Sequence, residues 1–396
     1  MKRLLPALIV LAVACGPGPT PPKASPSPVA TTPVARPSLA PFPSPTPGGP
    51  TPPPPVAVVC SSQVPAGHQL ALVSLHGVQG VVVRDVTDIN HPVTRCGFQG
   101  GAYFRFVNST RVSYIVTSSG DVGASGALYM VDLNQSTTSL VRAWSSGAYG
   151  SWVYAWSPDA QKLTYLSSDT TGVTWHLLSA AGDKVLASLG TTRLGGAALD
   201  NDDIMVGFSA DGQYVGVEST FITQKGSGAT APAIQIMKIS DLKQVYMRAD
   251  GTMAAWGATG ARFYFRTTGG VLVWEPTGKV QVVNPGLQWI RPWPSADGVH
   301  ITFSSVNPQG NHVVGILDTG GGPVAQATAE PRANPGFLTS TLIWYAGETR
   351  CTTTTPCGLG GPALTGNTYL YDIAGVESGS IDTAFYDSWP HNAGQA

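Results

Sequence analysis

The sequence predicts an all-β fold: a β-propeller of seven four-stranded blades that follows a disordered, proline-rich N-terminal tether. The composition is the first indication, because 47 Gly and 33 Pro in 396 residues, with only 11% charged residues, argue against a helical bundle. The second is a turn followed by a strand that recurs every 38 to 52 residues, the length of one blade. Six blades stay an alternative, because the first and last repeat units are the weakest.

The N-terminus has the pattern of an export signal. Lys2 and Arg3 precede an apolar run from Leu4 to Val13, which is too short for the roughly 20 residues that a membrane-spanning helix needs. Small residues then lead directly to Cys15, a pattern that resembles the bacterial lipobox, with Ala12 in place of the usual Leu. The resemblance implies a signal peptide over residues 1–14 and a diacylglyceryl group on Cys15. An ordinary secretory signal with a chance cysteine is the alternative, and it also exports the chain.

We expect residues 15–57 to form a disordered tether. Gly16 to Pro55 contains two charged residues, one aromatic residue and no apolar periodicity, so it cannot bury enough surface to offset its ordering entropy. Proline at this density favours polyproline II at about 3.1 Å per residue, so the segment could span on the order of 120 Å when extended. We expect the only membrane attachment to be the lipid.

From residue 58 to 396 the chain repeats. A turn signature such as Trp156-Ser157-Pro158-Asp159 precedes a strand that begins, in successive units, at residues 70, 112, 163, 215, 263, 301 and 343. Runs of β-branched and aromatic residues between Gly, Asp, Asn and Ser turns divide each unit into four short strands. Asp159, Asp211 and Asp297 lie in such turns, where we expect each carboxylate to accept backbone N–H groups.

The Ser-Pro-Asp turn, the following strand and a third strand that ends in Asp resemble the WD-repeat-like propeller repeat of TolB-type periplasmic proteins, over residues 58 to 396. The resemblance implies a propeller, but such blades occur in binding proteins, peptidase domains and envelope scaffolds alike. TolB-type proteins commonly have six blades. Trp152, Trp175, Trp274 and Trp344 are expected in the core between blades rather than on a ligand platform.

Four cysteines remain beyond Cys15, as expected of an exported protein. They allow three pairings, of which proximity in sequence favours Cys351 with Cys357 and leaves Cys60 with Cys96. A zinc site is the rival, although the sequence has no close Cys-x-x-Cys pair and its seven His are scattered.

No cofactor is expected. The run from Asp200 to Asp203, which includes Asp202, is the densest carboxylate group and could bind Ca²⁺, although such runs more often form solvated turns. The formal net charge of −1 and the lack of a Lys/Arg-rich stripe argue against a nucleic-acid partner. We expect a monomer.

Two functions are predicted. The first is a cell-surface or periplasmic lipoprotein, held on the outer side of the bacterial membrane, whose propeller binds or scaffolds a protein, peptide or glycan. The alternative is an extracytoplasmic hydrolase or lactonase with a metal in the central channel. The inner strands favour binding, because segments such as 101–103 and 251–253 carry no acidic or His residue. Enzymatic activity is therefore the less expected of the two.

In a four-stranded blade, the connections between strands two and three, and between blades, share one face, and the long insertions 118–126, 190–202, 219–232 and 347–366 all fall there. Long loops on a rigid scaffold commonly carry recognition. The predicted ligand contacts on these loops are Asp200, Asp202, Phe221, Lys225, Glu348 and Arg350.

Overall fold

The computed structural model describes residues 51–75, 80–119, 124–145, 153–168, 172–190, 204–219, 233–352, 362–381 and 383–390. The chain divides into two units, of which Met1–Ser38, with the predicted signal peptide and Cys15, lies outside the described residues. All regular elements described in the second unit, Leu39–Ala396, are β-strands, which confirms the all-β prediction. The described part of the chain has no helix long and apolar enough to cross a membrane.

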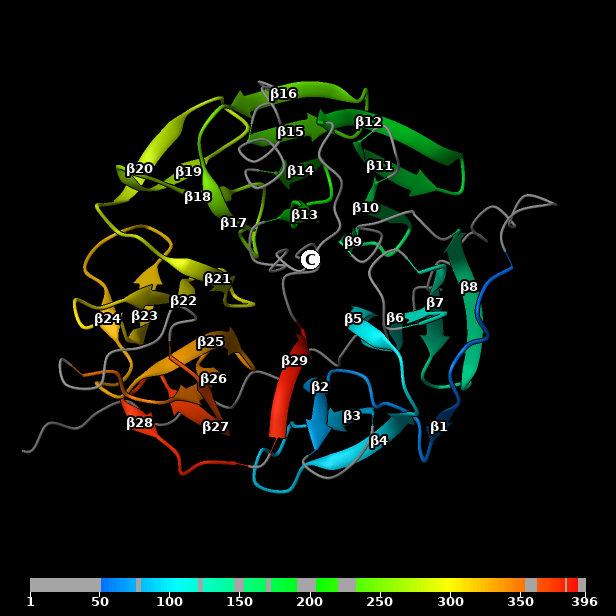
Figure 1. Ribbon diagram of the computed structural model, residues 1–396, viewed down its shortest axis with the longest axis horizontal. Helices are drawn as coiled ribbons and strands as arrows, with labels where there is room; N and C mark the ends of the chain where they lie inside the picture. The colour runs from blue at the N-terminus through cyan, green and yellow to red at the C-terminus, as the bar shows by residue number, and fades with distance from the viewer. Residues whose placement is uncertain are drawn as a thin grey trace, which may run out of the picture. The chain divides into compact units, whose positions relative to one another are not determined.

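Seven antiparallel sheets are arranged as blades around a central axis, so the seven-bladed prediction is confirmed (Figure 1). Six of them consist of four strands that follow one another in the sequence, and the first strand of each lies nearest the axis. Blade 2 comprises β5 (Ala102–Asn108), β6 (Arg111–Thr117), β7 (Gly126–Asp132) and β8 (Thr137–Trp144). Blade 3 comprises β9 (Tyr154–Trp156), β10 (Lys162–Ser168), β11 (Val173–Ser179) and β12 (Gly182–Gly190).

The next four blades repeat the pattern. Blade 4 comprises β13 (Met205–Phe208), β14 (Tyr214–Glu218), β15 (Ile234–Lys238) and β16 (Lys243–Arg248). Blade 5 comprises β17 (Thr252–Trp256), β18 (Phe263–Thr267), β19 (Gly270–Trp274) and β20 (Val280–Pro285). Blade 6 comprises β21 (Ile290–Pro294), β22 (His300–Val306), β23 (His312–Asp318) and β24 (Ala325–Gln326). Blade 7 comprises β25 (Arg332–Phe337), β26 (Leu342–Glu348), β27 (Leu364–Asp372) and β28 (Val376–Glu377).

Blade 1 closes the ring with both ends of the chain. It comprises β2 (Leu70–Leu75), β3 (Val81–Asp85) and β4 (Val93–Phe98), flanked by β1 (Val58–Cys60) outside and β29 (Thr383–Trp389) inside. Leu70 pairs with Trp389, so the C-terminal strand supplies the innermost position that the N-terminal segment leaves open. The predicted disulfide between Cys60 and Cys96 is present and joins β1 to β4.

The core is divided into seven layers, one between each pair of neighbouring blades. Each four-stranded sheet therefore buries both faces, as in other propellers. Trp175, Trp274 and Trp344 are buried in these layers, which confirms the core role expected of them, while Trp152 lies outside the described residues. The layer that joins blade 7 to blade 1 includes Trp344 and Val73, and it completes the ring.

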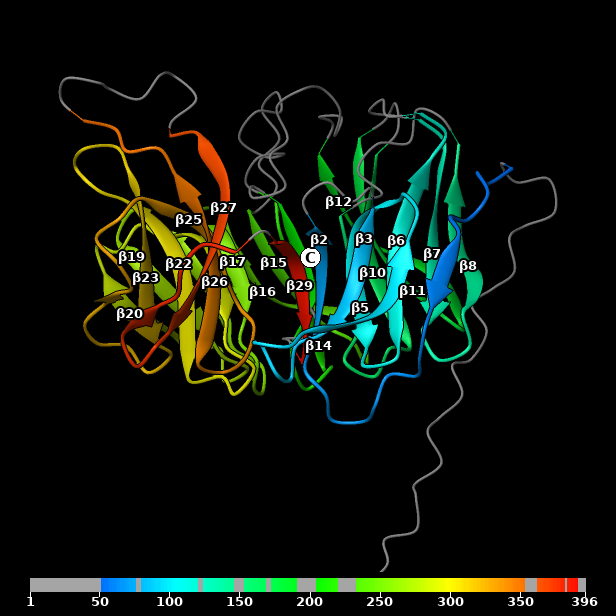
Figure 2. The same cartoon turned by 90° about the horizontal axis from the view of Figure 1, so that it is seen from below.

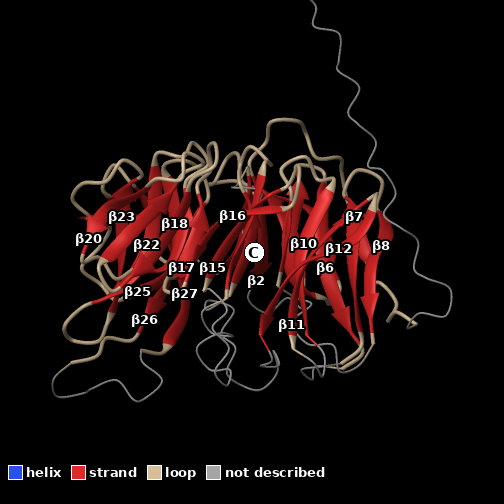
Figure 3. Cartoon of the chain, turned by 90° about the horizontal axis from the view of Figure 1, so that it is seen from above, coloured by secondary structure: helices blue, strands red, loops and turns tan. Residues whose placement is uncertain are grey.

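The strands run between two faces of the ring, seen edge-on in Figures 2 and 3. One face carries the connections from strand one to strand two and from strand three to strand four of each blade, and we call it the turn face. The opposite face carries the connections from strand two to strand three and from blade to blade, and we call it the loop face. On the turn face, Asp159, Asp211 and Asp297 each accept hydrogen bonds from the Ser hydroxyl two residues before and the backbone N–H two residues after, at 2.5 to 3.1 Å. The residue after each Asp has a φ of +58° to +74°. These carboxylates therefore build turns, as expected.

Candidate functional site

Most of the predicted contacts on the loop face lie outside the described residues: Asp200, Asp202, Phe221 and Lys225. Glu348, at the end of β26, is only 8% exposed, and its carboxylate oxygens lie 2.9 and 3.1 Å from Nδ1 of His312 in blade 6. Arg350 is half-exposed and forms an ion pair of 2.7 Å with Glu330. The structure thus brings Glu348 and Arg350 to the side of blade 7 that faces blade 6, each with a partner in the chain.

Hydrogen bonds hold the two ends of the insertion after β26 next to each other and next to blade 6. The Asn311 side chain donates a hydrogen bond to the carbonyl of Cys351 (3.0 Å) and accepts one from its backbone N–H (2.6 Å), and all of these groups are buried. Thr349 N–H donates to the carbonyl of Ala363 at 2.8 Å and joins the two ends. Cys351 is disulfide-bonded, and its predicted partner, Cys357, lies outside the described residues. Asn311 of blade 6 therefore holds Cys351, at the start of this insertion of blade 7.

The innermost strands of five blades contain a β-bulge, which lies near the beginning of the strand in four blades and in the middle of β29 in the fifth. The bulged residues occupy equivalent positions in blades 5, 6, 7, 1 and 2, which are consecutive around the ring (Figure 1). We call these five residues the axial arc: Met253, Arg291, Asn334, Tyr386 and Tyr103. All of them except Tyr386 have φ between +51° and +54°. This conformation costs a non-glycine residue on the order of 1 to 3 kcal/mol and persists only where the surroundings hold it.

The bulge changes how the side chain at this position is exposed. The two tyrosines of the arc are 40% (Tyr103) and 47% (Tyr386) exposed, and the other three side chains are half-buried. At the equivalent positions of the two remaining blades, Val153 and Met205 are each only 6% exposed. Because an extra residue in a strand redirects its side chain, the five side chains of the arc stay partly or largely exposed at a position that a regular strand buries.

Contacts from neighbouring blades hold the backbone of the arc. The Tyr154 hydroxyl of blade 3 donates to the carbonyl of Tyr103 at 2.6 Å, and Trp289 Nε1 of blade 6 donates to the carbonyl of Met253 at 2.9 Å. Asn334 N–H donates to the Ser304 hydroxyl of blade 6 at 3.2 Å. The bulge frees these backbone groups from the ladder of their own blade, so each one bonds to a neighbouring blade.

Next to Tyr386, the buried Asp387 carboxylate accepts hydrogen bonds from the backbone N–H of Phe106 (2.8 Å) and from its own neighbour Ser388 (2.9 Å). Both carboxylate oxygens are therefore occupied within the protein. The Ser388 hydroxyl donates to the carbonyl of Phe337 at 2.8 Å, so this short segment binds blade 1 to blades 2 and 7.

Burial raises the pKa of Tyr103 above its usual value, so its phenol is neutral at physiological pH.

Ser167, His176 and Asp183 lie in a line across three strands of blade 3. Ser167 Oγ is 2.8 Å from His176 Nε2, and His176 Nδ1 is 3.3 Å from Asp183 Oδ1. The His176 ring stacks on Tyr165 with 4.7 Å between centroids, and the Tyr165 hydroxyl donates to the Asp183 carboxylate. Arg142 of blade 2 lies 4.0 Å above the Tyr165 ring. These contacts join the strands of blade 3 to one another and to blade 2.

Among the described residues, no group of three or more His, Cys, Asp or Glu side chains is placed to hold a metal ion. The predicted calcium-binding run, Asp200 to Asp203, lies outside this part of the chain.

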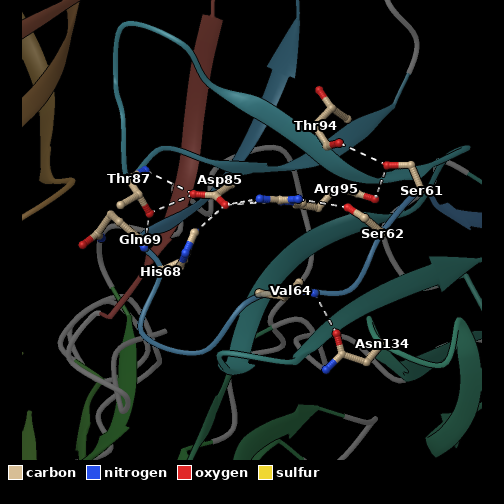
Figure 4. Close-up of polar contacts among 10 residues, drawn as sticks. All are labelled: Ser61, Ser62, Val64, His68, Gln69, Asp85, Thr87, Thr94, Arg95 and Asn134. Carbon is tan, nitrogen blue, oxygen red and sulfur yellow. Dashed lines mark hydrogen bonds and ion pairs between the residues drawn. The ribbon is translucent and has the colours of Figure 1, made fainter.

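A second polar cluster lies on the turn face of blade 1 (Figure 4). Asp85, only 4% exposed, accepts hydrogen bonds from Arg95 Nη2 at 2.5 Å and from the Thr87 hydroxyl at 2.8 Å, and it lies 2.6 Å from His68 Nδ1. Burial raises the pKa of Asp85, but the hydrogen bonds from Arg95, His68 and Thr87 together outweigh it and lower the pKa from 3.8 to about 2. The cluster thus stabilises the charged carboxylate.

We expect Asp85→Asn to lower the free energy of unfolding by about 2 kcal/mol at pH 7. A depressed pKa stabilises the folded state above pH 4, and this contribution is lost as the pH falls from 3.8 to about 2. Urea unfolding at pH 7, 4 and 2.5 should therefore show the two proteins converging at low pH. Asp88→Asn, at an exposed carboxylate paired with His91, is the control and should change little at any pH. A difference that persists unchanged at pH 2.5 would contradict this account.

In comparisons with known proteins, no family model and no curated protein matches this chain. Among solved structures, a prolyl endopeptidase is similar, at 12% identity and a TM-score of 0.52 over 84% of this chain, which spans 50% of that protein. TolB from Acinetobacter baumannii is similar at 17% identity and a TM-score of 0.41, over 80% of this chain and 81% of that one. The chain has the β-propeller fold. A periplasmic gluconolactonase of Pseudomonas aeruginosa matches at 13% identity and a TM-score of 0.48, over 80% of this chain and 96% of that one.

Proposed function

We propose that this chain is an exported lipoprotein, attached through Cys15 to the outer side of the bacterial membrane, whose propeller binds a partner on its loop face. A proline-rich tether would place the propeller at a distance from the membrane. Lipidation of Cys15 stays a prediction from the lipobox pattern.

One observation carries the binding role. The axial arc, in which four of the five residues have a costly backbone conformation, lies toward the side of the ring from which the long insertions of the chain also leave. Strained backbone that the surroundings hold in place is concentrated at functional sites. Loops carried by a rigid scaffold and grouped on one face are the usual form of a recognition surface.

The insertion between β14 and β15 offers a sharp test. Ser219 N–H donates to the carbonyl of Ala233 at 2.7 Å, so the two ends of the insertion are already adjacent, and an Asn-Gly turn can replace residues 220–232. We expect this variant to capture about tenfold less protein or glycan from a cell-envelope extract than the wild type does, or less still. Mass spectrometry and sugar analysis measure the captured material. Its melting temperature should be almost unchanged.

Asp241→Ala, on the turn face of the same blade, is the matched control and should retain the same envelope components as the wild type. If the shortened variant still captures them, or if the control loses them equally, the partner does not bind on the loop face and the proposal is wrong.

A further inference from the structure

Blade 3 contains a serine, a histidine and an aspartate in the order of a nucleophile, a base and an acid. Ser167 Oγ of β10 lies 2.8 Å from His176 Nε2 of β11, and His176 Nδ1 lies 3.3 Å from Asp183 Oδ1 of β12. A nucleophile within hydrogen-bond reach of a base, which a third group orients, is the signature of an activated side chain. This line is separate from the partner site proposed for the loop face.

The register of the sheet puts the three side chains on one face of blade 3. Tyr165 pairs with His176, and Leu178, two residues further along β11, pairs with Asp183. Ser167 follows Tyr165 by two residues on β10, and because the side chains of a strand alternate between faces, the two share a face. Tyr165 packs in the core layer between blades 2 and 3, so the line lies on the side of blade 3 that faces blade 2.

The Asp183 carboxylate is charged and sets the tautomer of the base. Burial raises the pKa of Asp183, but the hydrogen bonds from His176 and Tyr165, together with the nearby charges, outweigh it and hold the pKa below its usual value. A carboxylate only accepts hydrogen bonds, so it places the imidazole proton on Nδ1. Nε2 is then an acceptor, and the Ser167 hydroxyl donates to it.

Tyr165 holds both the base and the acid. Its hydroxyl donates to Oδ2 of Asp183, and its ring stacks on the His176 imidazole with 4.7 Å between centroids and 7° between planes. Burial raises the pKa of Tyr165, so the phenol keeps its proton and remains a donor. The stack and the carboxylate together restrict rotation of the imidazole, which keeps Nε2 within reach of the Ser167 hydroxyl.

The nucleophile lies where a small molecule can approach it. The ladder between β9 and β10 ends at Tyr165, so Ser167 belongs to the part of β10 that continues past the inner strand toward the loop face. Residues 163–166 are buried, whereas Ser167 is half-buried. We propose that Ser167 is a nucleophile that takes the acyl group of small carboxylic esters, with His176 as its base and Asp183 as the residue that positions the base.

The reaction balances with water as the only co-reactant. Ser167 Oγ bonds to the carbonyl carbon of the ester while its proton passes to His176 Nε2. The bond from that carbon to the alcohol oxygen then breaks, and the imidazolium gives the proton to the leaving alcohol. Water attacks the acyl-serine with the same base, so one ester and one water yield one carboxylic acid and one alcohol. General-base catalysis of this kind contributes about 10²–10⁴-fold.

An ethyl phosphonofluoridate tests the nucleophile in the full mature protein, because it forms a stable bond from phosphorus to an activated serine oxygen and releases fluoride. Mass spectrometry should find the label on Ser167. We expect Ser167→Ala to lose the label and His176→Gln to slow labelling by about a hundredfold or more. Release of nitrophenolate from para-nitrophenyl acetate measures acyl transfer and should fall in the same variants.

Variants of Asp183 separate positioning of the base from folding. Asp183→Asn can donate to Nδ1, which moves the imidazole proton to Nε2 and removes the acceptor of the Ser167 hydroxyl, so labelling should slow as in His176→Gln. Asp183→Glu restores the carboxylate and should recover part of the rate. His300→Gln, which removes a contact of 2.9 Å with Asp318 in blade 6, is the matched control and should be labelled as the wild type is. Melting curves establish that each variant is folded.

The proposal is overturned if the wild type carries no label on Ser167, a result that needs no variant, or if His176→Gln and Asp183→Asn are labelled at the wild-type rate. Labelling of Ser167 that both variants slow and that His300→Gln leaves unchanged supports it. Neither result affects the binding role proposed for the loop face, which is measured by envelope capture.

Discussion

A chain that ends at Ile381 should fail to form a stable propeller. The truncation removes β29, the innermost strand of blade 1, and exposes the edge of β2, where Leu70, Ala71, Leu72 and Val73 are completely buried. Burying a single Leu or Val side chain is worth about 1.5 to 3 kcal/mol, and a domain is typically stable by only about 5 to 15 kcal/mol. The lost strand therefore accounts for a large fraction of the stability.

The polar contacts of β29 add to this loss. Without Asp387, the buried N–H of Phe106 in blade 2 loses its acceptor, and without Ser388 the contact with Phe337 of blade 7 is lost. Phe385 also stacks on Trp344 of blade 7, with 5.3 Å between ring centroids. Both neighbours of blade 1 are thus affected, and the ring opens.

The measurement is thermal unfolding followed by near-ultraviolet circular dichroism, together with gel filtration. We expect the truncated chain to aggregate or to melt without a cooperative transition. A chain that ends at Pro390 is the matched control, because it keeps all of β29 and should behave like the full chain. A truncated protein that melts cooperatively near the wild-type temperature would show that β29 is not needed for closure.

The repeating part of the fold is predictable from the sequence because its signals are local. The seven positions from 70 to 343 predicted to begin a strand each lie within one residue of the start of the second strand of a blade. The turn that precedes each strand needs a carboxylate or a glycine at a fixed place, and Asp159 and Gly212 supply them. Counting such turns is enough to count blades.

The closure of the ring has no comparable signal. Leu70 pairs with Trp389 through backbone hydrogen bonds, over more than three hundred residues of intervening chain. Backbone groups are the same at every position, so register across such a distance depends on packing that the sequence pattern alone does not reveal. The role of the last strand is visible only in the structure.

The axial arc is only partly foreseeable. Left-handed backbone is usually marked by Gly, Asn or Asp, but tyrosine, methionine and arginine also adopt it here, and neighbouring blades hold the backbone of Tyr103 and Met253. The inner-strand segments 101–103 and 251–253 already included Tyr103 and Met253. A usable signal would be distance, since four of the five arc residues lie three positions before the residue that ends their inner strand, as Tyr386 does before Trp389, whereas Tyr103 lies five positions before Asn108.

The sequence also placed Glu348 and Arg350 on the loop face without indicating their partners. His312 lies 36 residues before Glu348, in a different blade, and their contact depends on how blades 6 and 7 pack. Loop position therefore predicts which side of the ring a residue occupies, but not whether its side chain is buried.

The Cys60→Ser/Cys96→Ser double variant should lose about 4 kcal/mol of stability. The disulfide closes a loop with a sequence separation of 36 residues, and a link of that length restricts the unfolded chain by about this amount. For a domain of this size the melting temperature should fall by roughly 6 °C. The double variant leaves the second bonded cysteine, Cys351, unchanged, whereas a reducing agent would attack both bonds.

Loss of the disulfide should loosen β1 more than it lowers the stability of the whole domain, because β1 is the junction between tether and propeller. The strand has only three residues and pairs with β4 alone. Without the disulfide, three contacts still hold this segment: the short ladder with β4, the packing of Val56 and Val58 against the core of blades 1 and 2, and the 2.5 Å hydrogen bond from the Tyr129 hydroxyl to the carbonyl of Pro53. Hydrogen exchange in β1 should therefore accelerate more than in the other strands of blade 1. Ser61→Ala, which removes only exposed contacts of 3.3 Å beside the bond, is the control and should shift stability by less than about 0.5 kcal/mol. If β1 exchanges at the wild-type rate in the double variant, packing alone holds the junction, and the disulfide is not what fixes the tether to blade 1.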